Sequence, residues 1–218
     1  MTAQYDTIGG SGLQFFGKVS ASVSHELKNV LAIINENAGL LEDLTFAARR
    51  GSPIDPDRLE RTVQNFAKQI RRADEILKNM NRFAHSVDQF EAQVDLGDLA
   101  GLVAQLAGRK AAMGRILLET TPPSQPVVLT TNPFLVENPI WLTLECAIAA
   151  TAAGGTIRLE SEKTNDAVLL HVSGISDLAG SLPGGMPAGH EDILAALGAT
   201  MKPDIDGNRL TLQFGQAG

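Results

Sequence analysis

The chain has 218 residues, which is enough for one large domain or two small ones, and 44% of them are hydrophobic. A formal net charge of −7 and an aromatic content of 5% argue against a general nucleic-acid binder. No run approaches the roughly 20 apolar residues that span a bilayer, and the N-terminal MTAQYDTIGGSG lacks the features of a signal peptide. The one cysteine, Cys146, cannot form an internal disulfide, which fits a reducing cytoplasm. Together with the charge and the lack of a long apolar run, this leads us to expect a cytoplasmic protein with no nucleic-acid or membrane partner.

Two long segments between residues 13 and 89 repeat core positions, most of them apolar, at alternating steps of three and four. The first series is Phe16, Ser20, Val23, Leu27, Val30, Ile34, Leu41 and Leu44, and the second is Leu59, Val63, Phe66, Ile70, Ala73, Leu77, Met80 and Ala84. The intervening RRGSPIDPD supplies stop and start signals for helices, at Gly51, Pro53 and Pro56. This spacing predicts a long antiparallel helical hairpin. A lone hairpin leaves its apolar seam uncovered, so we expect a homodimer with a four-helix bundle.

After Asp95 the pattern changes to alternating helical and β-rich segments. Helices are expected at 96–113, at ENPIWLTLECAIAATAAG and at HEDILAALGA; strands are expected at ILLETT, VVLTT, GTIRLESEK, AVLLHVSG and GNRLTLQF. We expect Asn138 to cap the second of these helices, with Pro139 at its first position. SLPGGMPAG is expected to be a flexible loop. The sequence therefore predicts an α+β chain with a helical hairpin over residues 1–92 and an α/β sandwich over residues 93–218.

The stretch VSHELKN places a histidine on the first predicted helix. Val23 and Leu27 face the core, so His25 lies on the solvent side, and a surface histidine without a task is the simplest interpretation. A helical HExxH zinc site needs a second imidazole one turn on, where this chain has Asn29. The chain also lacks the G-x-S-x-G elbow of serine hydrolases and a G-x-x-x-x-G-K-[ST] phosphate loop. We expect no metal or cofactor site in this chain.

Phosphoryl chemistry on nitrogen is the remaining possibility for His25. A neutral imidazole is a competent nucleophile when a carboxylate fixes its tautomer, and Glu26 is laterally adjacent on the helix. Asn29 shares the face of His25, where an amide can orient a water molecule. Ordinary solvated polarity also accounts for both residues.

The segment FFGKVSASVSHELKNVLAIINENAGLLEDL resembles the phosphoacceptor helix of sensor histidine kinases. The resemblance covers residues 13–89 and implies that His25 is phosphorylated, that Glu26 is its acid/base partner and that Asn29 is the position associated with phosphatase activity. It also implies the dimeric four-helix bundle that the periodicity indicates independently. Nothing before residue 13 is expected to form a sensor domain.

Residues 95–218 resemble the ATP-binding domain of the same family in layout, with Asn132–Pro133 in the Asp-Pro place. The family's two nucleotide-binding asparagines are replaced by Leu142 and Cys146, which are poor ligands for a hard cation. The adenine-reading Asp-x-Gly-x-Gly is replaced by SGIS, and Asp177 comes too late. The resemblance thus implies a degenerate GHKL/histidine-kinase-ATPase-like sandwich that has lost nucleotide binding.

This combination resembles the histidine phosphotransferases of the ChpT type and the sporulation phosphorelay type, although SHELKN is closer to true kinases. The resemblance implies phosphoryl transfer between response-regulator aspartates through His25, with Mg²⁺ supplied by the receiver partner. A hairpin that turns near residue 52 places residue 79 level with His25, so we expect receivers to dock on Lys78, Asn79 and Arg82. Three alternatives stay open: an ATP-dependent kinase with a diverged nucleotide site, a non-catalytic scaffold, and a phosphatase that acts through Asn29.

Overall fold

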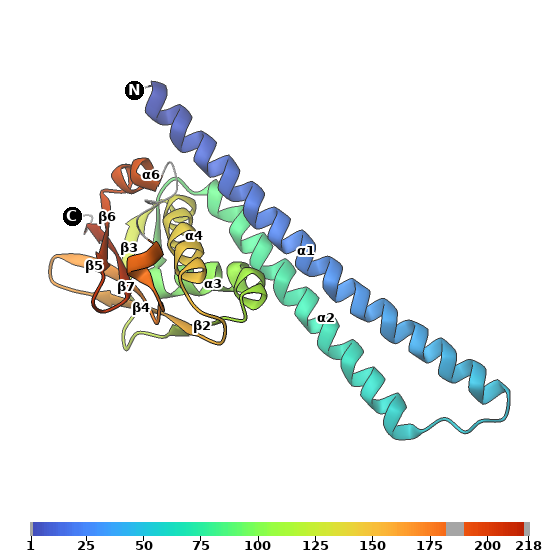
Figure 1. Cartoon of the computed structure of the whole chain (residues 1–218). Helices are drawn as coiled ribbons and strands as arrows, with labels where there is room; N and C mark the ends of the chain where they lie inside the picture. Colours follow the sequence, from blue (N-terminus) through green and yellow to red (C-terminus); the bar gives the residue numbers. More distant parts are fainter. Residues whose placement is uncertain (1, 182–189, 216–218) are drawn as a thin grey trace.

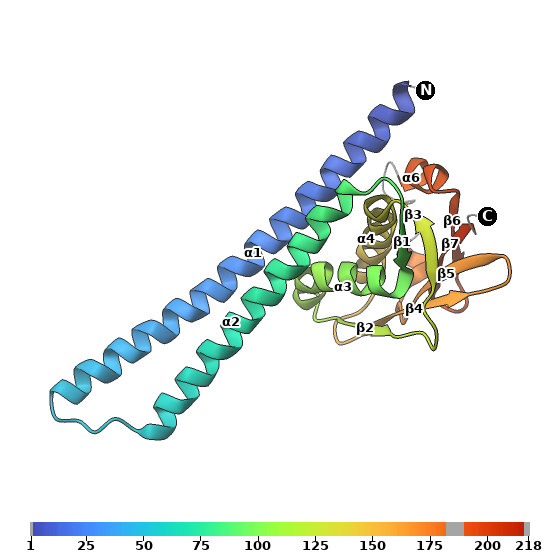
Figure 2. The same ribbon diagram turned by 180° about the vertical axis from the view of Figure 1, so that it is seen from behind.

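The computed structural model describes residues 2–181 and 190–215 and has two parts, a helical hairpin and an α/β sandwich (Figure 1). The hairpin consists of α1 (Thr2–Arg49) and α2 (Pro56–His85), which run antiparallel. The sandwich packs against the end of the hairpin that carries the C-terminus of α2 (Figure 2). The predicted hairpin is confirmed, and α1 begins earlier than the apolar repeat indicates.

The start of α2 shows why the chain turns where it does. Gly51 has a φ of 90°, a left-handed conformation that costs glycine little. The carboxylate of Asp55 then accepts a hydrogen bond from the backbone N–H of Asp57 at 3.0 Å and caps the helix. Pro56 occupies the first turn of α2, where its missing N–H leaves no helical bond unmade.

The sandwich contains a five-stranded sheet in the order β2-β4-β5-β7-β6 and a separate antiparallel pair, β1 and β3. Its elements are η1 (Ser86–Asp88), β1 (Ala92–Asp95), α3 (Leu96–Met113), β2 (Leu117–Thr121), β3 (Val128–Thr131), α4 (Pro133–Ala149), β4 (Thr156–Lys163), β5 (Ala167–Ser173), α5 (Leu178–Ser181), α6 (His190–Ala196), β6 (Ala199–Asp204) and β7 (Arg209–Gly215). Only β2 and β4 pair in parallel within the described sheets. The expected helices and strands are present, and β1, β6 and the short helix α5 are additions that the sequence did not indicate.

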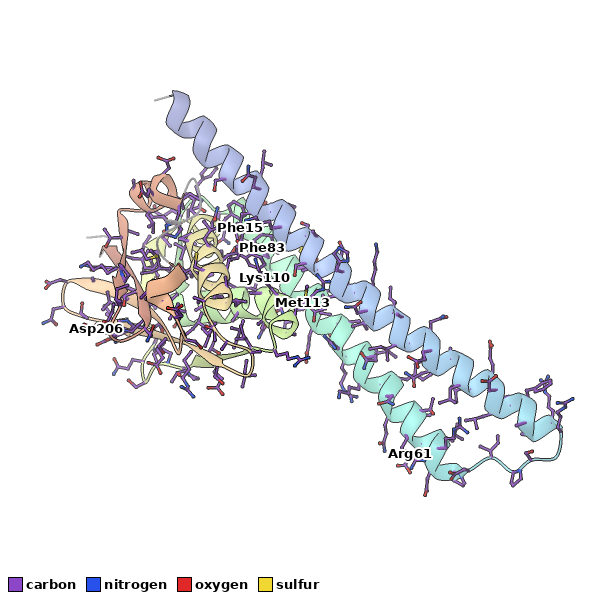
Figure 3. The ribbon with its side chains drawn as sticks, viewed as in Figure 1. Phe15, Arg61, Phe83, Lys110, Met113 and Asp206 are labelled. Carbon is purple, nitrogen blue, oxygen red and sulfur yellow. The ribbon has the colours of Figure 1, made fainter. Side chains whose placement is uncertain are left out.

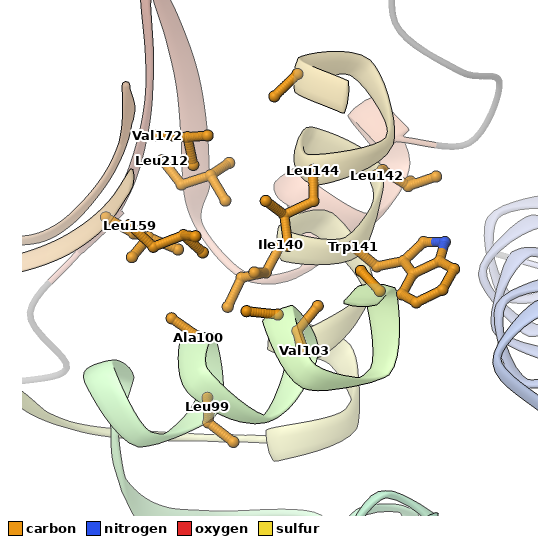
Figure 4. Close-up of a cluster of buried hydrophobic side chains, with 14 of the residues drawn as sticks. Leu99, Ala100, Val103, Ile140, Trp141, Leu142, Leu144, Leu159, Val172 and Leu212 are labelled. Atoms are coloured by element: carbon orange, nitrogen blue, oxygen red, sulfur yellow. The ribbon is translucent and has the colours of Figure 1, made fainter. Parts of the chain in front are cut away.

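The core of the sandwich lies between the sheet and the helices α3 and α4. Alternate residues of the central strands point toward the helices, among them Leu159, Val172 and Leu212 (Figure 4). Ile140 and Leu144 of α4 point back toward them, and all five side chains are buried. One layer of helices on one layer of sheet is the architecture that the sequence predicts. The division of the chain at residues 92 and 93 stays a prediction.

The predicted start of α4 is wrong. The helix begins at Pro133, and the Asn132 side chain accepts a hydrogen bond from the backbone N–H of Leu135 at 3.0 Å. Asn138 and Pro139 lie within the helix and are buried. Both positions carry an Asn-Pro pair, which has the local signature of a helix start, and the earlier pair is the one that caps α4. Most of the predicted loop SLPGGMPAG, residues 182–189, lies outside the described residues.

Aromatic side chains join the hairpin to the sandwich. Phe15 of α1 meets Phe83 of α2 edge to face, with ring centroids 5.2 Å apart (Figure 3). Phe134 and Trp141 of α4 lie 5.4 and 6.0 Å from Phe15 on the sandwich side. Phe16 stacks on Phe83 at 5.4 Å. These five rings form the aromatic junction, and they fix the position of the sandwich at one end of the hairpin.

Candidate functional site

His25 lies on the solvent-exposed face of α1. Val23 and Val30 are buried toward α2 and the sandwich, whereas His25 and Asn29 are exposed one helical turn apart. Within the described residues, no side chain hydrogen-bonds to the His25 ring. The imidazole is therefore open to a partner molecule. The functional roles of His25 and Asn29 stay predictions.

Glu26 points toward α2. Its carboxylate oxygen Oε1 accepts a hydrogen bond from Nη2 of Arg72 at 3.1 Å. The Glu26 side chain is 17% exposed, and the Arg72 side chain is 50% exposed. The predicted acid/base partner of His25 is therefore paired with a cation on the neighbouring helix.

This ion pair also shows the register of the hairpin. The residue of α2 that lies level with Glu26 is Arg72, and the contact between Phe15 and Phe83 repeats that register further along. The expectation that residue 79 lies level with His25 is therefore wrong. It assumed a symmetrical turn, whereas the link between α1 and α2 runs back along α1 before α2 begins (Figure 1). Asn79 lies closer to the sandwich.

Lys78, Asn79 and Arg82, the predicted docking residues, all line one groove between α2 and α3 with a volume of about 810 Å³. We call this the α2–α3 groove; its lining residues are Val23, Glu26, Lys68, Arg71, Arg72, Glu75, Ile76, Lys78, Asn79, Arg82, Gln105 and Leu106. The structure thus brings Glu26 into the same groove as the predicted docking residues, while His25 and Asn29 lie outside its lining. A docking role for the three residues stays a prediction.

A buried carboxyl ties the end of the hairpin to α4. The Oγ atom of Ser86 lies 2.8 Å from Oε2 of Glu137 and 2.7 Å from the carbonyl oxygen of Phe83. A serine hydroxyl has one proton, so it donates to one of these acceptors at a time. The Ser86 hydroxyl therefore shares its proton between the Phe83 carbonyl and the Glu137 carboxyl, and donation to Glu137 favours the charged carboxylate. Burial raises the pKa of Glu137 to about 7, while the Ser86 hydrogen bond and the charge of Arg82 oppose this rise.

A second polar contact joins three helices on the same side of the sandwich. Glu145 of α4 accepts hydrogen bonds from Lys18 of α1 at 3.1 Å and from Lys110 of α3. Burial alone raises the pKa of Glu145, but the hydrogen bonds and charges of the two lysines outweigh burial and lower the pKa below its usual value. The carboxylate is therefore charged and holds α1, α3 and α4 together.

The positions that hold nucleotide in the resembled domain carry other chemistry in this chain. Leu142 is 6% exposed and packs in the core, and Cys146 is half-buried. Burial is the main cause that raises the pKa of the Cys146 thiol. Asp177 accepts a hydrogen bond from the backbone N–H of Gly180 at 2.8 Å, at the start of α5. These side chains therefore serve packing and helix capping, and they offer no oxygen-rich site for a magnesium–nucleotide complex.

Within residues 2–181 and 190–215, no three or more His, Cys, Asp or Glu side chains cluster in a way that could hold a metal ion. In the same residues no helix combines the length and the apolar character needed to cross a membrane.

No protein-family model matches this chain, and no curated sequence does. Solved structures with a similar layout include several histidine kinases. The Acinetobacter baumannii histidine kinase AdeS is 16% identical over 89% of this chain and 98% of that chain, with a TM-score of 0.47. A histidine kinase from Burkholderia phymatum is 16% identical over 87% and 99%, with a TM-score of 0.46. The histidine kinase ThkA in complex with the response regulator protein TrrA is 17% identical over 94% and 63%, with a TM-score of 0.48. Values this low carry no inference about activity, and the fold described above rests on this chain's own elements.

Sequence reasoning missed Arg72, Glu137 and Glu145. Arg72 is one of several cations along α2, and the sequence does not say which of them meets Glu26. In the sequence, Glu137 and Glu145 look like ordinary solvated carboxylates about two turns apart on a helix. A polar residue within the strongly apolar run VENPIWLTLECAIA is the one signal that could have marked them as buried.

Proposed function

We propose that this protein is a histidine phosphotransferase of a two-component phosphorelay and passes phosphoryl groups between response-regulator aspartates through His25. It acts as a homodimer in the cytoplasm, and the receiver partner supplies Mg²⁺. The proposal rests on the resemblance at SHELKN together with the exposure of His25. One contrast supports it most: His25 is open to partners, whereas the nucleotide positions hold the packed Leu142 and the half-buried Cys146.

The transfer needs alignment and charge neutralisation more than covalent help from the protein. An imidazole nitrogen of His25 attacks the phosphorus atom of an aspartyl phosphate. The N–P bond forms, the bond from phosphorus to the aspartate oxygen breaks, and the aspartate leaves as a carboxylate. The other ring nitrogen then releases its proton to the solvent around the exposed ring, which removes the positive charge that developed on the imidazole. The same steps in reverse deliver the phosphoryl group to a second aspartate.

Exposed apolar side chains on the hairpin support the homodimer. On α2 these are Leu59, Val63, Ile70 and Leu77, and on α1 they are Leu13, Leu31 and Phe46. Those on α2 follow steps of four and seven, the repeat of a bundle seam, and they face away from the seam between α1 and α2. A second hairpin laid along this stripe would cover it and complete four helices.

Transfer of label from a phosphorylated receiver tests the proposal. Purified protein is incubated separately with labelled ATP and with receiver domains that carry a labelled aspartyl phosphate. We expect label on the protein from a receiver, none from ATP, and none with the His25→Ala variant. Stoichiometric labelling from ATP alone would establish a kinase instead.

Two comparisons separate the remaining functions. If Asn29→Ala stops the loss of phosphate from a receiver while His25→Ala does not, the protein is a phosphatase. If His25→Ala leaves signalling through the pathway intact in cells, the bundle is a scaffold. Phosphotransfer requires that His25→Ala abolish both transfer and signalling.

A further inference from the structure

The α2–α3 groove concentrates positive charge in an acidic chain. Five of its lining residues are cations of α2: Lys68, Arg71, Arg72, Lys78 and Arg82. Two lining residues, Glu26 and Glu75, are carboxylates. The whole chain has a formal net charge of −7, so the groove differs in sign from the protein around it.

Most of these cations have no partner. In the part of the chain that the structure describes, Lys68, Arg71 and Lys78 lie beyond salt-bridge distance of any carboxylate, and Arg72 pairs with Glu26. Arg82 acts on the buried Glu137 through its charge. An anionic ligand would therefore meet several positive charges that the protein itself does not neutralise.

The base of the groove is apolar. Val23 of α1, Ile76 of α2 and Leu106 of α3 are buried there, and α2 and α3 lie side by side in both views (Figures 1 and 2). A groove of about 810 Å³ with an apolar base and charged walls suits side chains of a protein segment better than a small ion.

We propose that the α2–α3 groove seats an acidic surface of the partner, and that Arg72 couples this seat to His25 by exchanging Glu26 for a partner carboxylate. This inference rests on the proposed function, because the partner is taken to be a receiver domain. A receiver that holds Mg²⁺ next to an aspartyl phosphate must gather carboxylates there, since Mg²⁺ takes oxygen ligands. Its surface is thus complementary to the groove.

The exchange keeps Arg72 paired with a carboxylate. The Arg72 side chain is 50% exposed and is open to a partner, whereas the Glu26 side chain is 17% exposed, so losing Arg72 costs more than breaking a pair of surface side chains. Partner carboxylates that bind Lys68 and Arg71 must therefore supply the free energy that draws Arg72 from Glu26. Glu26 follows His25 directly on α1, so its release from Arg72 leaves an unneutralised negative charge one residue from the ring. That charge favours the imidazolium that forms during attack on phosphorus. Partner binding and nucleophile activation are thereby linked.

The coupling is tested first without any partner, by measuring the rate at which phosphoramidate phosphorylates His25. Arg72→Gln removes the cation that neutralises Glu26, so we expect the rate to rise severalfold. Glu26→Gln should lower the rate, and the double variant should match Glu26→Gln. Arg61→Gln is the matched control, because Arg61 is an exposed cation near the far end of α2 (Figure 3). An Arg72→Gln rate equal to that of Arg61→Gln overturns the coupling.

The seat is tested by titration with the unphosphorylated receiver domain that labels His25 in the transfer assay. The triple variant Lys68→Gln, Arg71→Gln, Lys78→Gln should bind the receiver at least tenfold more weakly than the wild type and with a smaller salt dependence. Binding equal to that of the wild type overturns the seat. A competition experiment gives a second test, in which ATP, inorganic polyphosphate or an acidic peptide displaces the bound receiver. If ATP or polyphosphate displaces it at a lower concentration than the peptide does, the groove serves a small polyanion and the proposed seat is overturned. If no receiver labels His25, the proposed function itself fails. If receivers label the wild type and the substituted variants equally well, the function stands and only the seat fails.

Discussion

At the scale of single residues, Glu137 is a carboxyl whose pKa folding raises to about 7, so that it keeps its proton in weakly acidic solution. It is 1% exposed, its Oε2 contacts Ser86, and its Oε1 has no hydrogen-bond partner among the described residues. A charged carboxylate in such a place would be costly. The neutral acid is therefore the form that joins the hairpin to α4.

This protonation makes stability depend on pH. The pKa of Glu137 rises from 4.5 to about 7 on folding, so the folded chain retains a proton that the unfolded chain releases between these values. The stabilisation is complete below about pH 4.5 and is lost as the pH rises to about 7. At about 1.4 kcal/mol per pKa unit, the loss is on the order of 3 kcal/mol. Glu137→Gln, which cannot ionise, should unfold with a flatter pH dependence, measured by urea denaturation from pH 4 to pH 8.

His190 affects the pH dependence of the free energy of unfolding in the opposite direction from Glu137. Burial lowers its pKa from 6.5 to about 4 and outweighs a hydrogen bond to the Pro139 backbone. The neutral ring therefore contributes stability that is present above about pH 6.5 and is lost as the pH falls toward 4. The quantity to plot is the difference between wild type and Glu137→Gln, because the His190 contribution cancels in it. A difference that does not change with pH would show that Glu137 is ionised in the folded chain.

At the scale of elements, α4 depends on one of two Asn-Pro pairs. Asn132→Ala removes the cap of α4 and the 3.1 Å hydrogen bond from Nδ2 to the Gln89 carbonyl. We expect it to lower the free energy of unfolding by about 1 kcal/mol. Asn138→Ala is the matched control, because that amide is buried with neither polar atom paired among the described residues, and losing it should cost less. Chemical denaturation gives both values, and the reverse order would mean that α4 begins near Asn138.

The same element shows what sequence could and could not predict. The hairpin was predictable because two long segments repeat mostly apolar residues at helical spacing, with Ser20 and Asn37 the polar exceptions in the first, and each repeat needs a partner. The start of α4 was not predictable, because two Asn-Pro pairs have the same local signature and only tertiary burial determines which of them begins the helix. The pairing of Glu26 with Arg72 was likewise beyond sequence, since the path of residues 50–55 sets the register. His25 and its exposure followed directly from the apolar seam.

At the scale of the whole molecule, the exposed stripe of α2 predicts assembly. Ile70 and Leu77 are 58% and 49% exposed one heptad apart. The double variant Ile70→Glu, Leu77→Glu places carboxylates in the proposed seam, so we expect a monomer in light scattering where the wild type is a dimer. Gln64→Glu with Arg61→Glu, a change of exposed polar residues on the same helix, should leave the dimer intact. A dimeric stripe variant would place the interface elsewhere.

The aromatic junction makes the hairpin and the sandwich one cooperative unit. Phe83 is fully buried against Phe15, Phe16 and Phe134 and lies next to the contact between Ser86 and Glu137. Phe83→Ala should lower the free energy of unfolding by about 3–5 kcal/mol, because it removes a large ring and leaves a cavity. It should also uncouple the two parts, so that fluorescence of Trp141, the one tryptophan, changes before helical circular dichroism as urea is raised. Phe90→Ala, at a side chain that is 94% exposed, should keep one transition that both probes report together. Coincident probes in Phe83→Ala would mean that the salt bridges of Glu145 suffice to hold the sandwich on the hairpin.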